Sequence, residues 1–161
     1  MILLDTNVIS ETMRKRPDPA VSSWLLLHPR AEMWTTSIVI AELLSGIETM
    51  PIGRKQRVLR EAVEEMIAED FHGQVLSFNL AAARHFARIR AARLQAGRPI
   101  PDIDAQIAAI ARAHGAMVAT KNIDDFSDCG IDLVNPWSGE TAKVKWPTPS
   151  LLPSRFSPPG G

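Results

Sequence analysis

Apolar positions along this chain follow two alternating patterns, short uninterrupted runs and stripes at helical spacing. Uninterrupted runs are typical of strands buried on both faces, whereas stripes are typical of helices that bury one side. The runs that predict strands lie at residues 2–4, 33–36, 74–78, 116–120 and 131–134. The segments that predict helices lie at residues 8–13, 20–27, 38–47, 54–67, 80–95 and 103–114. This alternation predicts an α/β fold, with a central, mostly parallel sheet of about five strands flanked by helices.

Residues with special backbone roles mark the ends of several predicted helices. Ser37 and Asp102 stand just before apolar stripes, where a side-chain oxygen can accept a hydrogen bond from the first turn as an N-cap. Gly97 and Gly115 follow two of the helices, at the C′ position that favours glycine. These signals separate the predicted helices from the strands that follow them.

The periodic pattern extends over residues 1–137 and fails in residues 138–161. The final segment is rich in proline, serine and glycine, a composition that does not bury enough apolar surface to build a core. We therefore predict one domain over residues 1–137 and a mobile, Pro-rich C-terminal tail over residues 138–161.

Composition indicates an ordinary globular protein and restricts its compartment. The 18 basic and 18 acidic residues cancel, so the net charge argues neither for nor against binding to nucleic acid. The single Cys129 excludes an intramolecular disulfide and fits a reducing compartment. No signal-peptide pattern opens the chain, and no apolar stretch approaches the roughly 20 residues of a membrane helix. We expect a cytoplasmic protein without membrane attachment.

Three acidic residues stand in apolar surroundings. Asp5 directly follows the first apolar run, Glu42 interrupts an apolar stripe, and Asp104 lies in a helix of apolar and small residues. Burial of a carboxylate costs several kcal/mol unless a partner or a cation compensates. Ends of strands and starts of helices meet at the ligand crevice of an open α/β sheet. The three carboxylates are therefore expected to converge there on a divalent cation, and oxygen ligands favour Mg²⁺ or Mn²⁺.

Each of these residues also has an ordinary structural explanation. Asp5 can cap the helix after it, Glu42 can be a solvated helix residue, and Asp104 can interact with the helix dipole. Zinc is disfavoured because the cysteine and the four histidines show no ligand spacing. The histidines are His28, His72, His85 and His114. Convergence on a cation explains the three acidic residues together, whereas the ordinary explanations treat each one separately.

Four short motifs resemble the successive motifs of PIN-domain ribonucleases, and most closely those of the VapC-type toxins of bacterial toxin–antitoxin pairs. The motifs are Asp5-Thr6-Asn7, Ser37-x-x-x-Ala41-Glu42-Leu43, Asp104-Ala105-Gln106-Ile107-Ala108-Ala109 and Ala119-Thr120-Lys121-Asn122-x-x-Asp125-Phe126. The resemblance covers residues 1–137 and implies a three-layer PIN-like fold. It also implies a metal-dependent endoribonuclease acting on single-stranded RNA, a cognate antitoxin as partner, and a homodimer.

The resemblance assigns Asp5, Glu42 and Asp104 as the acidic ligands of Mg²⁺ or Mn²⁺. The fourth acidic position is open, because Asn122 stands where some members have an acid and Asp125 follows three residues later. Asp125 is therefore included among the catalytic candidates. The polar residues of the motifs are expected to hydrogen-bond the carboxylates and orient them. These residues are Thr6, Asn7, Ser37, Thr120 and Asn122.

An RNA substrate requires a cationic track for its backbone. One candidate cluster consists of Arg84, Arg88, Arg90, Arg93 and Arg98, and another of Arg54, Lys55, Arg57 and Arg60. Runs of this kind are more often solvated helix faces. Lys121 is the better single candidate because it adjoins the fourth motif, and Arg84 and Arg98 are retained beside it.

Two other enzyme classes and one non-catalytic function are alternatives to the nuclease. Haloacid-dehalogenase-like phosphatases need a second aspartate where this chain has Asn7. Receiver domains need an acidic pair after the first strand and a phospho-acceptor aspartate after the third, where Leu4 and Asn79 stand. A non-catalytic PIN-like module that binds RNA or protein stays open, because Asn122 replaces an acidic residue.

Overall fold

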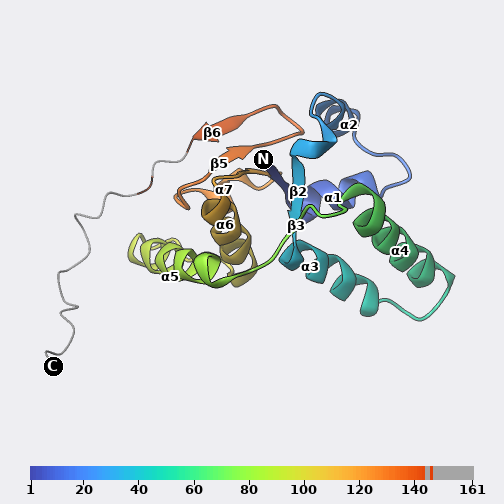
Figure 1. The fold of residues 1–161 in the computed structure, drawn as a ribbon, viewed down its shortest axis with the longest axis horizontal. Helices are drawn as coiled ribbons and strands as arrows, with labels where there is room; N and C mark the ends of the chain where they lie inside the picture. The colour runs from blue at the N-terminus through green and yellow to red at the C-terminus, as the bar shows by residue number, and fades with distance from the viewer. Residues whose placement is uncertain (144–145, 147–161) are drawn as a thin grey trace, which may run out of the picture.

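The computed structural model describes residues 1–143 and residue 146, which form a six-stranded sheet with helices on both sides (Figure 1). The strands are β1 (Ile2–Leu4), β2 (Met33–Thr36), β3 (Val75–Leu76), β4 (Met117–Ala119), β5 (Asp132–Val134) and β6 (Thr141–Lys143). The helices are α1 (Thr6–Thr12), α2 (Pro19–Leu26), α3 (Ser37–Glu48), α4 (Arg54–Glu65), α5 (Leu80–Gln95), α6 (Asp102–His114) and α7 (Ile123–Phe126). A 3₁₀ turn (Arg30–Glu32) precedes β2, and a π-helical turn (Met66–Asp70) continues α4.

The sheet has the strand order β3-β2-β1-β4-β5-β6. The first five strands in this order run parallel, and β6 runs antiparallel to β5. From β1 the chain moves to β2 and β3 on one side, and then returns to the other side of β1 with β4. Such a change of direction opens a crevice at the carboxyl ends of the two central strands, where parallel sheets bind ligands.

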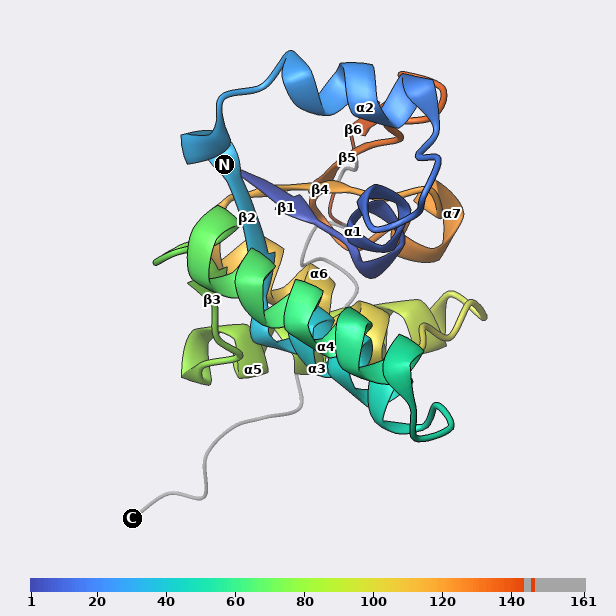
Figure 2. The ribbon, with the colours of Figure 1, turned by 90° about the vertical axis from the view of Figure 1, so that its right-hand side faces the viewer.

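The helices form two layers around the sheet. Figure 2 shows α2 on one side of the strands, and α3, α4, α5 and α6 gathered on the other. The three-layer α/β fold predicted from the sequence is therefore confirmed. Within residues 1–143 and 146, no helix combines the length and the apolar character needed to cross a membrane.

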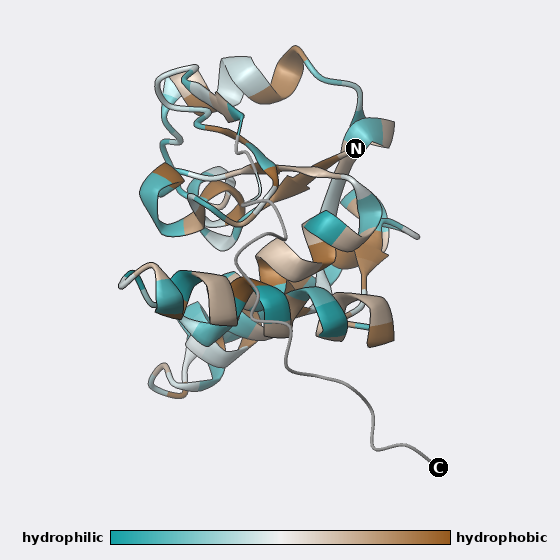
Figure 3. Ribbon diagram, turned by 90° about the vertical axis from the view of Figure 1, so that its left-hand side faces the viewer, coloured by the Kyte–Doolittle hydropathy of each residue, from teal (hydrophilic) through white to brown (hydrophobic). Residues whose placement is uncertain are grey.

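The core is built on the central strands. All three residues of β1 are buried, and Leu3, Val118 and Leu133 on three neighbouring strands are fully buried. The central strands are brown, and thus apolar, in Figure 3, whereas the helices at the surface carry mixed colours. A strand covered by helices on both faces needs apolar residues at every position, which explains the unbroken runs in the sequence.

Two predicted N-caps are wrong. The cap of α3 is Thr36, whose hydroxyl accepts a hydrogen bond from the Val39 N–H at 3.1 Å, so Ser37 is the first helical residue. Thr36 ends β2 with an extended backbone, which is the conformation that an N-cap requires. Likewise Pro101 precedes α6 in the cap position, and Asp102 opens the helix.

One predicted strand is much shorter in the structure, and one strand is additional to the prediction. The strand predicted at residues 74–78 is reduced to Val75–Leu76, because only these residues pair with β2. Residues 141–143 were predicted to belong to the tail, but they form β6 and bring the sheet to six strands. A tight turn supports this pairing, since the Asn135 N–H donates to the Glu140 carbonyl at 2.8 Å. Residues 144–145 and 147–161 of the predicted tail lie outside the described residues.

Replacement of Leu3 by alanine is expected to lower the free energy of unfolding by about 3 kcal/mol, because it removes packing and leaves a cavity in the core. Urea denaturation followed by circular dichroism measures this change. Leu26→Ala is the control, because Leu26 is 88% exposed and surface substitutions alter stability by less than about 0.5 kcal/mol. Equal effects of the two substitutions would contradict the central place of β1 in the core.

Candidate active site

Asp5 lies at the carboxyl end of β1, immediately before α1. Its backbone N–H donates to the Ala119 carbonyl of β4 at 3.0 Å, so the backbone is held in line with the sheet. Its side chain is 5% exposed, and Oδ1 accepts a hydrogen bond from the Thr6 N–H at 2.8 Å. Asp5 is therefore the N-cap of α1, and it is also a buried carboxylate at the ligand crevice.

The second carboxylate oxygen of Asp5 is held by side chains from two elements. Oδ2 accepts hydrogen bonds from Thr120 Oγ1 and from Asn7 Nδ2, each at 2.8 Å. Asn7 also donates to Thr120 Oγ1 at 3.2 Å and accepts from the Lys121 N–H at 3.1 Å. The structure thus joins the first and fourth motifs around one buried carboxylate, whose orientation is fixed by these bonds.

Glu42 reaches the same region from α3. Its Oε2 accepts a hydrogen bond from the hydroxyl of Thr6, the residue whose backbone N–H binds Asp5. Thr6 therefore contacts two of the predicted ligands at once. The Glu42 side chain is half-buried, which excludes the simple interpretation of a fully solvated helix residue.

Asp104 lies in the first turn of α6 and is half-buried. Desolvation raises the pKa of Asp104 to about 6, and the negative charges of Asp5, Asp125 and Glu42 add to this increase. Desolvation also raises the pKa of Asp5, against the hydrogen bonds from Thr120 and Thr6, and the charge of Glu42 raises it further. Asp104 is therefore close enough to the three other carboxylates to be affected by their charges, and Asp5 is close enough to Glu42.

The acidic cluster, which we define as Asp5, Glu42, Asp104 and Asp125, has the donor chemistry for a hard cation. None of its members forms an ion pair with lysine or arginine among the described residues. Carboxylate oxygens suit Mg²⁺ or Mn²⁺, and a divalent charge would reduce the mutual repulsion. Within residues 1–143 and 146, however, no three His, Cys, Asp or Glu side chains are arranged to hold a metal ion. Joint ligation would require these side chains to move closer together.

A pocket of about 370 Å³ opens beside α7 and contains both candidates for the fourth position. Its lining residues are Lys121, Asn122, Ile123, Asp124, Asp125, Asn135 and Glu140. The charge of Asp125 acts on Asp104, whereas Asn122 is linked to the site through its backbone N–H, which donates to Thr120 Oγ1 at 3.0 Å. Asp125 therefore has the electrostatic connection to the cluster, and Asn122 has a hydrogen-bonded one.

Two of the pocket residues come from outside the four sequence motifs. Asn135 and Glu140 flank the turn between β5 and β6, well beyond the fourth motif. Pairing of β5 with β4 brings this turn beside α7. No pattern in the sequence marks these residues, because asparagine and glutamate are common in surface turns.

The side chains of the remaining predicted site residues, Ser37 and the three basic candidates for RNA binding, lie outside the hydrogen-bonded group around Asp5. Ser37 is half-buried at the start of α3, and among the described residues no hydrogen bond links it to the carboxylates. Lys121 is exposed, with Nζ 5.2 Å from the centre of the Trp137 ring. Arg84 is exposed on α5. Arg98 forms an ion pair with Asp128 at 3.0 Å.

The predicted arginine track on α5 is wrong in one member. Arg93 is 5% exposed, so its guanidinium is not available to an RNA backbone. Arg90 pairs with Asp102 at 3.1 Å, and both side chains stay more than half exposed. In the second basic cluster, Arg60 pairs with Glu48 at 2.7 Å.

Comparisons of the sequence with a family model and with known proteins indicate the same family. A family model described as the PIN domain matches residues 2–131. The "VapC ribonuclease Y4jK" of Sinorhizobium fredii is 39% identical over 137 residues, which are 85% of this chain and 98% of that protein. The "Toxin FitB" of Neisseria gonorrhoeae is 37% identical over 137 residues, or 85% and 99% of the two chains.

The fold also agrees with a solved structure of the same kind. The crystal structure of FitAcB from Neisseria gonorrhoeae superposes with a TM-score of 0.80 at 37% sequence identity. The superposition covers 86% of this chain and 99% of that one. Sequence and structure therefore lead to the same relatives.

Replacement of Asp104 by asparagine is expected to stabilise the metal-free protein above about pH 6 and to have little effect below about pH 4. The pKa of Asp104 rises from 3.8 to about 6 on folding, so the folded state binds this proton more tightly. Stability of the wild type therefore falls as the pH rises through that window. Thermal unfolding in EDTA as a function of pH measures the difference. Asp132→Asn, at an exposed position of β5, is the control, and identical pH profiles for Asp104→Asn and the wild type would refute the raised pKa of Asp104.

Proposed function

Because the chain belongs to the PIN-domain family, with VapC-type toxins among its relatives, we propose that it is a metal-dependent endoribonuclease of a toxin–antitoxin pair. Its substrate is single-stranded RNA, and the reaction is hydrolysis of a phosphodiester bond. The convergence of Asp5, Glu42, Asp104 and Asp125 at the carboxyl end of a central strand is the observation that carries the proposal.

The proposed cofactor is Mg²⁺, with Mn²⁺ as a substitute. Asp5, Glu42 and Asp104 would hold it, with Asn122 or Asp125 at the fourth position. When bound, the ion supplies Lewis acidity that favours hydrolysis of a phosphodiester. The proposal is supported by the oxygen-rich donor set and by the raised pKa of Asp104, which is caused first by desolvation and then by the neighbouring acids.

The residues around Asp5 orient its carboxylate before any substrate arrives. Thr120 and Asn7 each donate to Oδ2, which fixes the plane of the carboxylate. Thr6 donates its hydroxyl to Glu42 and thereby couples the two acids. Fixed donors of this kind reduce the reorganisation needed when a charged ligand binds.

RNA would approach along the exposed rim of the site. Lys121 is exposed directly after Thr120 and can neutralise a backbone phosphate. The adjoining pocket of about 370 Å³ has the size of a small-molecule site and extends from Lys121 past Asp125. We propose that it receives a nucleotide next to the cleaved bond.

A cognate antitoxin and a second copy of the chain are the proposed protein partners. The relative named as a toxin supports the antitoxin. Leu26 and Leu27, at the C-terminal end of α2, are 88% and 80% exposed and offer apolar contact area.

A non-catalytic PIN-like module that binds RNA or protein is the second candidate. Two observations favour it. Among the described residues, the acids are not arranged for joint metal ligation, and Asn122 stands where an acid could complete the site. A module of this kind would keep the fold and the antitoxin contact without cleaving RNA.

Purified protein is expected to cleave single-stranded members of a mixed RNA pool with Mg²⁺ or Mn²⁺, and not with EDTA. Asp5→Asn and Asp104→Asn are each expected to reduce cleavage to the EDTA level while the circular dichroism spectrum is retained, because each loses a ligand. Asp132→Asn should cleave like the wild type.

Near-wild-type cleavage by either site variant would refute that ligand assignment. Cleavage that is equal in EDTA would refute the metal dependence. Absence of both cleavage and Mn²⁺ binding in folded wild-type protein would favour the non-catalytic module.

Asn122→Asp is expected to preserve or strengthen Mg²⁺ binding, because it adds an anionic oxygen at the fourth position. Isothermal titration of the RNA-free protein measures the affinity, with Asp125→Asn compared in parallel. Weaker binding by Asn122→Asp would place residue 122 outside the metal site, and unchanged binding by Asp125→Asn would do the same for residue 125.

A further inference from the structure

Arg93, near the end of α5, is a buried cation that the proposed chemistry does not use. Its Nε donates to the Arg98 carbonyl at 2.7 Å, and its Nη1 donates to the Ser127 carbonyl at 2.5 Å and to Ser127 Oγ at 3.1 Å. Burial of a guanidinium is unfavourable unless its donors are satisfied. Here Nε binds the loop directly after α5, whereas Nη1 binds Ser127, 34 residues further along the chain, so Arg93 ties these two segments together.

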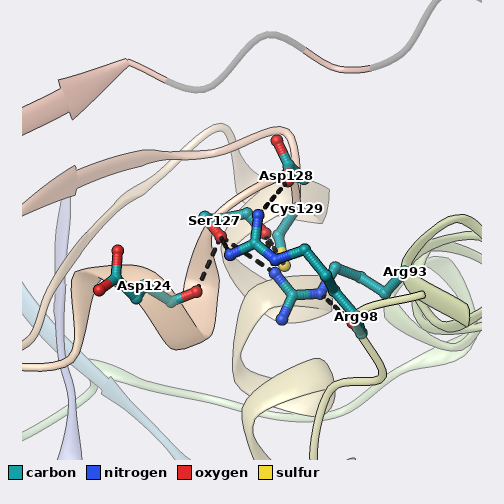
Figure 4. Close-up of polar contacts among 6 residues, drawn as sticks. All are labelled: Arg93, Arg98, Asp124, Ser127, Asp128 and Cys129. Atoms are coloured by element: carbon teal, nitrogen blue, oxygen red, sulfur yellow. Dashed lines mark hydrogen bonds and ion pairs between the residues drawn. The ribbon is translucent and has the colours of Figure 1, made fainter. Parts of the chain in front are cut away.

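Ser127 is the point at which these contacts meet, as Figure 4 shows. Its hydroxyl oxygen accepts from Arg93 and also from Arg98 Nη2 at 2.8 Å. The same hydroxyl donates to the Asp124 carbonyl of α7 at 2.7 Å. We call Arg93, Arg98 and Ser127 the arginine clamp. The clamp holds the C-terminal end of α7.

The loop after α7 needs such support. Asp128 has a φ of +60°, which places a residue other than glycine in the left-handed region at a cost in backbone energy. Arg98 Nη1 donates to Asp128 Oδ2 at 3.0 Å. This ion pair fixes Asp128 to Arg98, the first residue of the segment 98–101 that precedes α6.

The clamp joins the two segments that carry Asp104 and Asp125. Residues 98–101 run from Arg98 directly into α6, whose first turn contains Asp104. Ser127 follows α7 directly, and α7 contains Asp125. The chain before one acid is therefore fixed to the chain after the other.

We infer that Arg93 and Arg98 are positioning residues of the acidic cluster, which act through Ser127 to fix α7 against the start of α6. They set the separation of Asp104 and Asp125 without contact with either carboxylate. This inference rests on the proposed function, and it replaces the predicted RNA-binding role of Arg98.

Arginine is required at position 93 by geometry and not by charge alone. A planar guanidinium presents several N–H groups in fixed directions, whereas a lysine ammonium is a point charge on a flexible stem. Arg93→Lys therefore keeps the charge and loses the simultaneous contacts with residues 98 and 127. Ser127→Ala removes the shared hydroxyl with a minimal change in volume.

A matched control is available in another loop. Gln56 is 5% exposed, and its Nε2 donates to the carbonyls of Ile47 and Met50 at 3.1 and 3.4 Å. It ties the last turn of α3 and the loop between α3 and α4 by the same kind of contact, and both contacts lie more than one helical turn after Glu42. Gln56→Ala therefore reports a general loss of stability.

Three measurements test the clamp in the full chain. Arg93→Lys is expected to weaken Mn²⁺ binding to the RNA-free protein by about tenfold, as for changes around the ligands of other metal sites. Its kcat for RNA cleavage should fall while KM stays near the wild-type value. Hydrogen exchange should become faster in residues 123–128. Ser127→Ala should change all three in the same direction, whereas Gln56→Ala should lower Tm and leave Mn²⁺ affinity unchanged.

Unchanged exchange at residues 123–128 in both clamp variants would overturn the inference. Equal loss of Mn²⁺ affinity in Arg93→Lys and Gln56→Ala would overturn it as well, because the effect would then be one of stability. If Arg93→Lys does not fold, Ser127→Ala decides. Wild-type protein that binds no Mn²⁺ would refute the proposed metal site, and hydrogen exchange would then decide on the clamp separately.

Discussion

The buried carboxylate of Asp5 is the constraint on which the site depends. A charge at the end of a fully buried strand is tolerated only when its oxygens are hydrogen-bonded. The donors come from the first turn of α1 and from the end of β4, the strand that pairs with β1 on the side of the crevice. Asn7 also donates a hydrogen bond to Thr120 and accepts one from the backbone N–H of Lys121, in the segment that leads to α7. The hydrogen bonds that satisfy the Asp5 carboxylate therefore also order the carboxyl ends of the two central strands.

The same edge carries the four acids of the acidic cluster. Among the described residues, no lysine or arginine forms an ion pair with them. Desolvation and neighbouring acids raise the pKa of Asp104. Stability is thus lower than it would be with uncharged residues at these positions. Functional sites commonly carry such a cost, and a cation that binds the folded state would recover part of it.

The arginines of α5 show how helical position decides the role of a charged residue. Ala82, Ile89 and Arg93 are the buried residues of this helix, and their spacing of seven and four places them on one face. Arg93 therefore points toward the core, while Arg84, Arg88 and Arg90 remain exposed. The basic run suggests a solvated or RNA-binding face, but the apolar stripe that continues into Arg93 is the signal that separates this residue from the others.

The sequence alone determined the α/β class, most helices and strands, and the acidic motifs, because these depend on residues close together in the chain. An unbroken apolar run predicts a strand covered on both faces. The position of Asp5 directly after such a run can be read from the sequence without knowledge of its neighbours in space. Only the tertiary structure decided that Thr-Ala-Lys at residues 141–143 forms a strand, that Asn135 and Glu140 line the pocket, and that Arg93 holds Ser127. The pairing of an edge strand whose one apolar residue is Ala142, and the partners of the Arg93 guanidinium, depend on segments distant in sequence, so no local pattern encodes them.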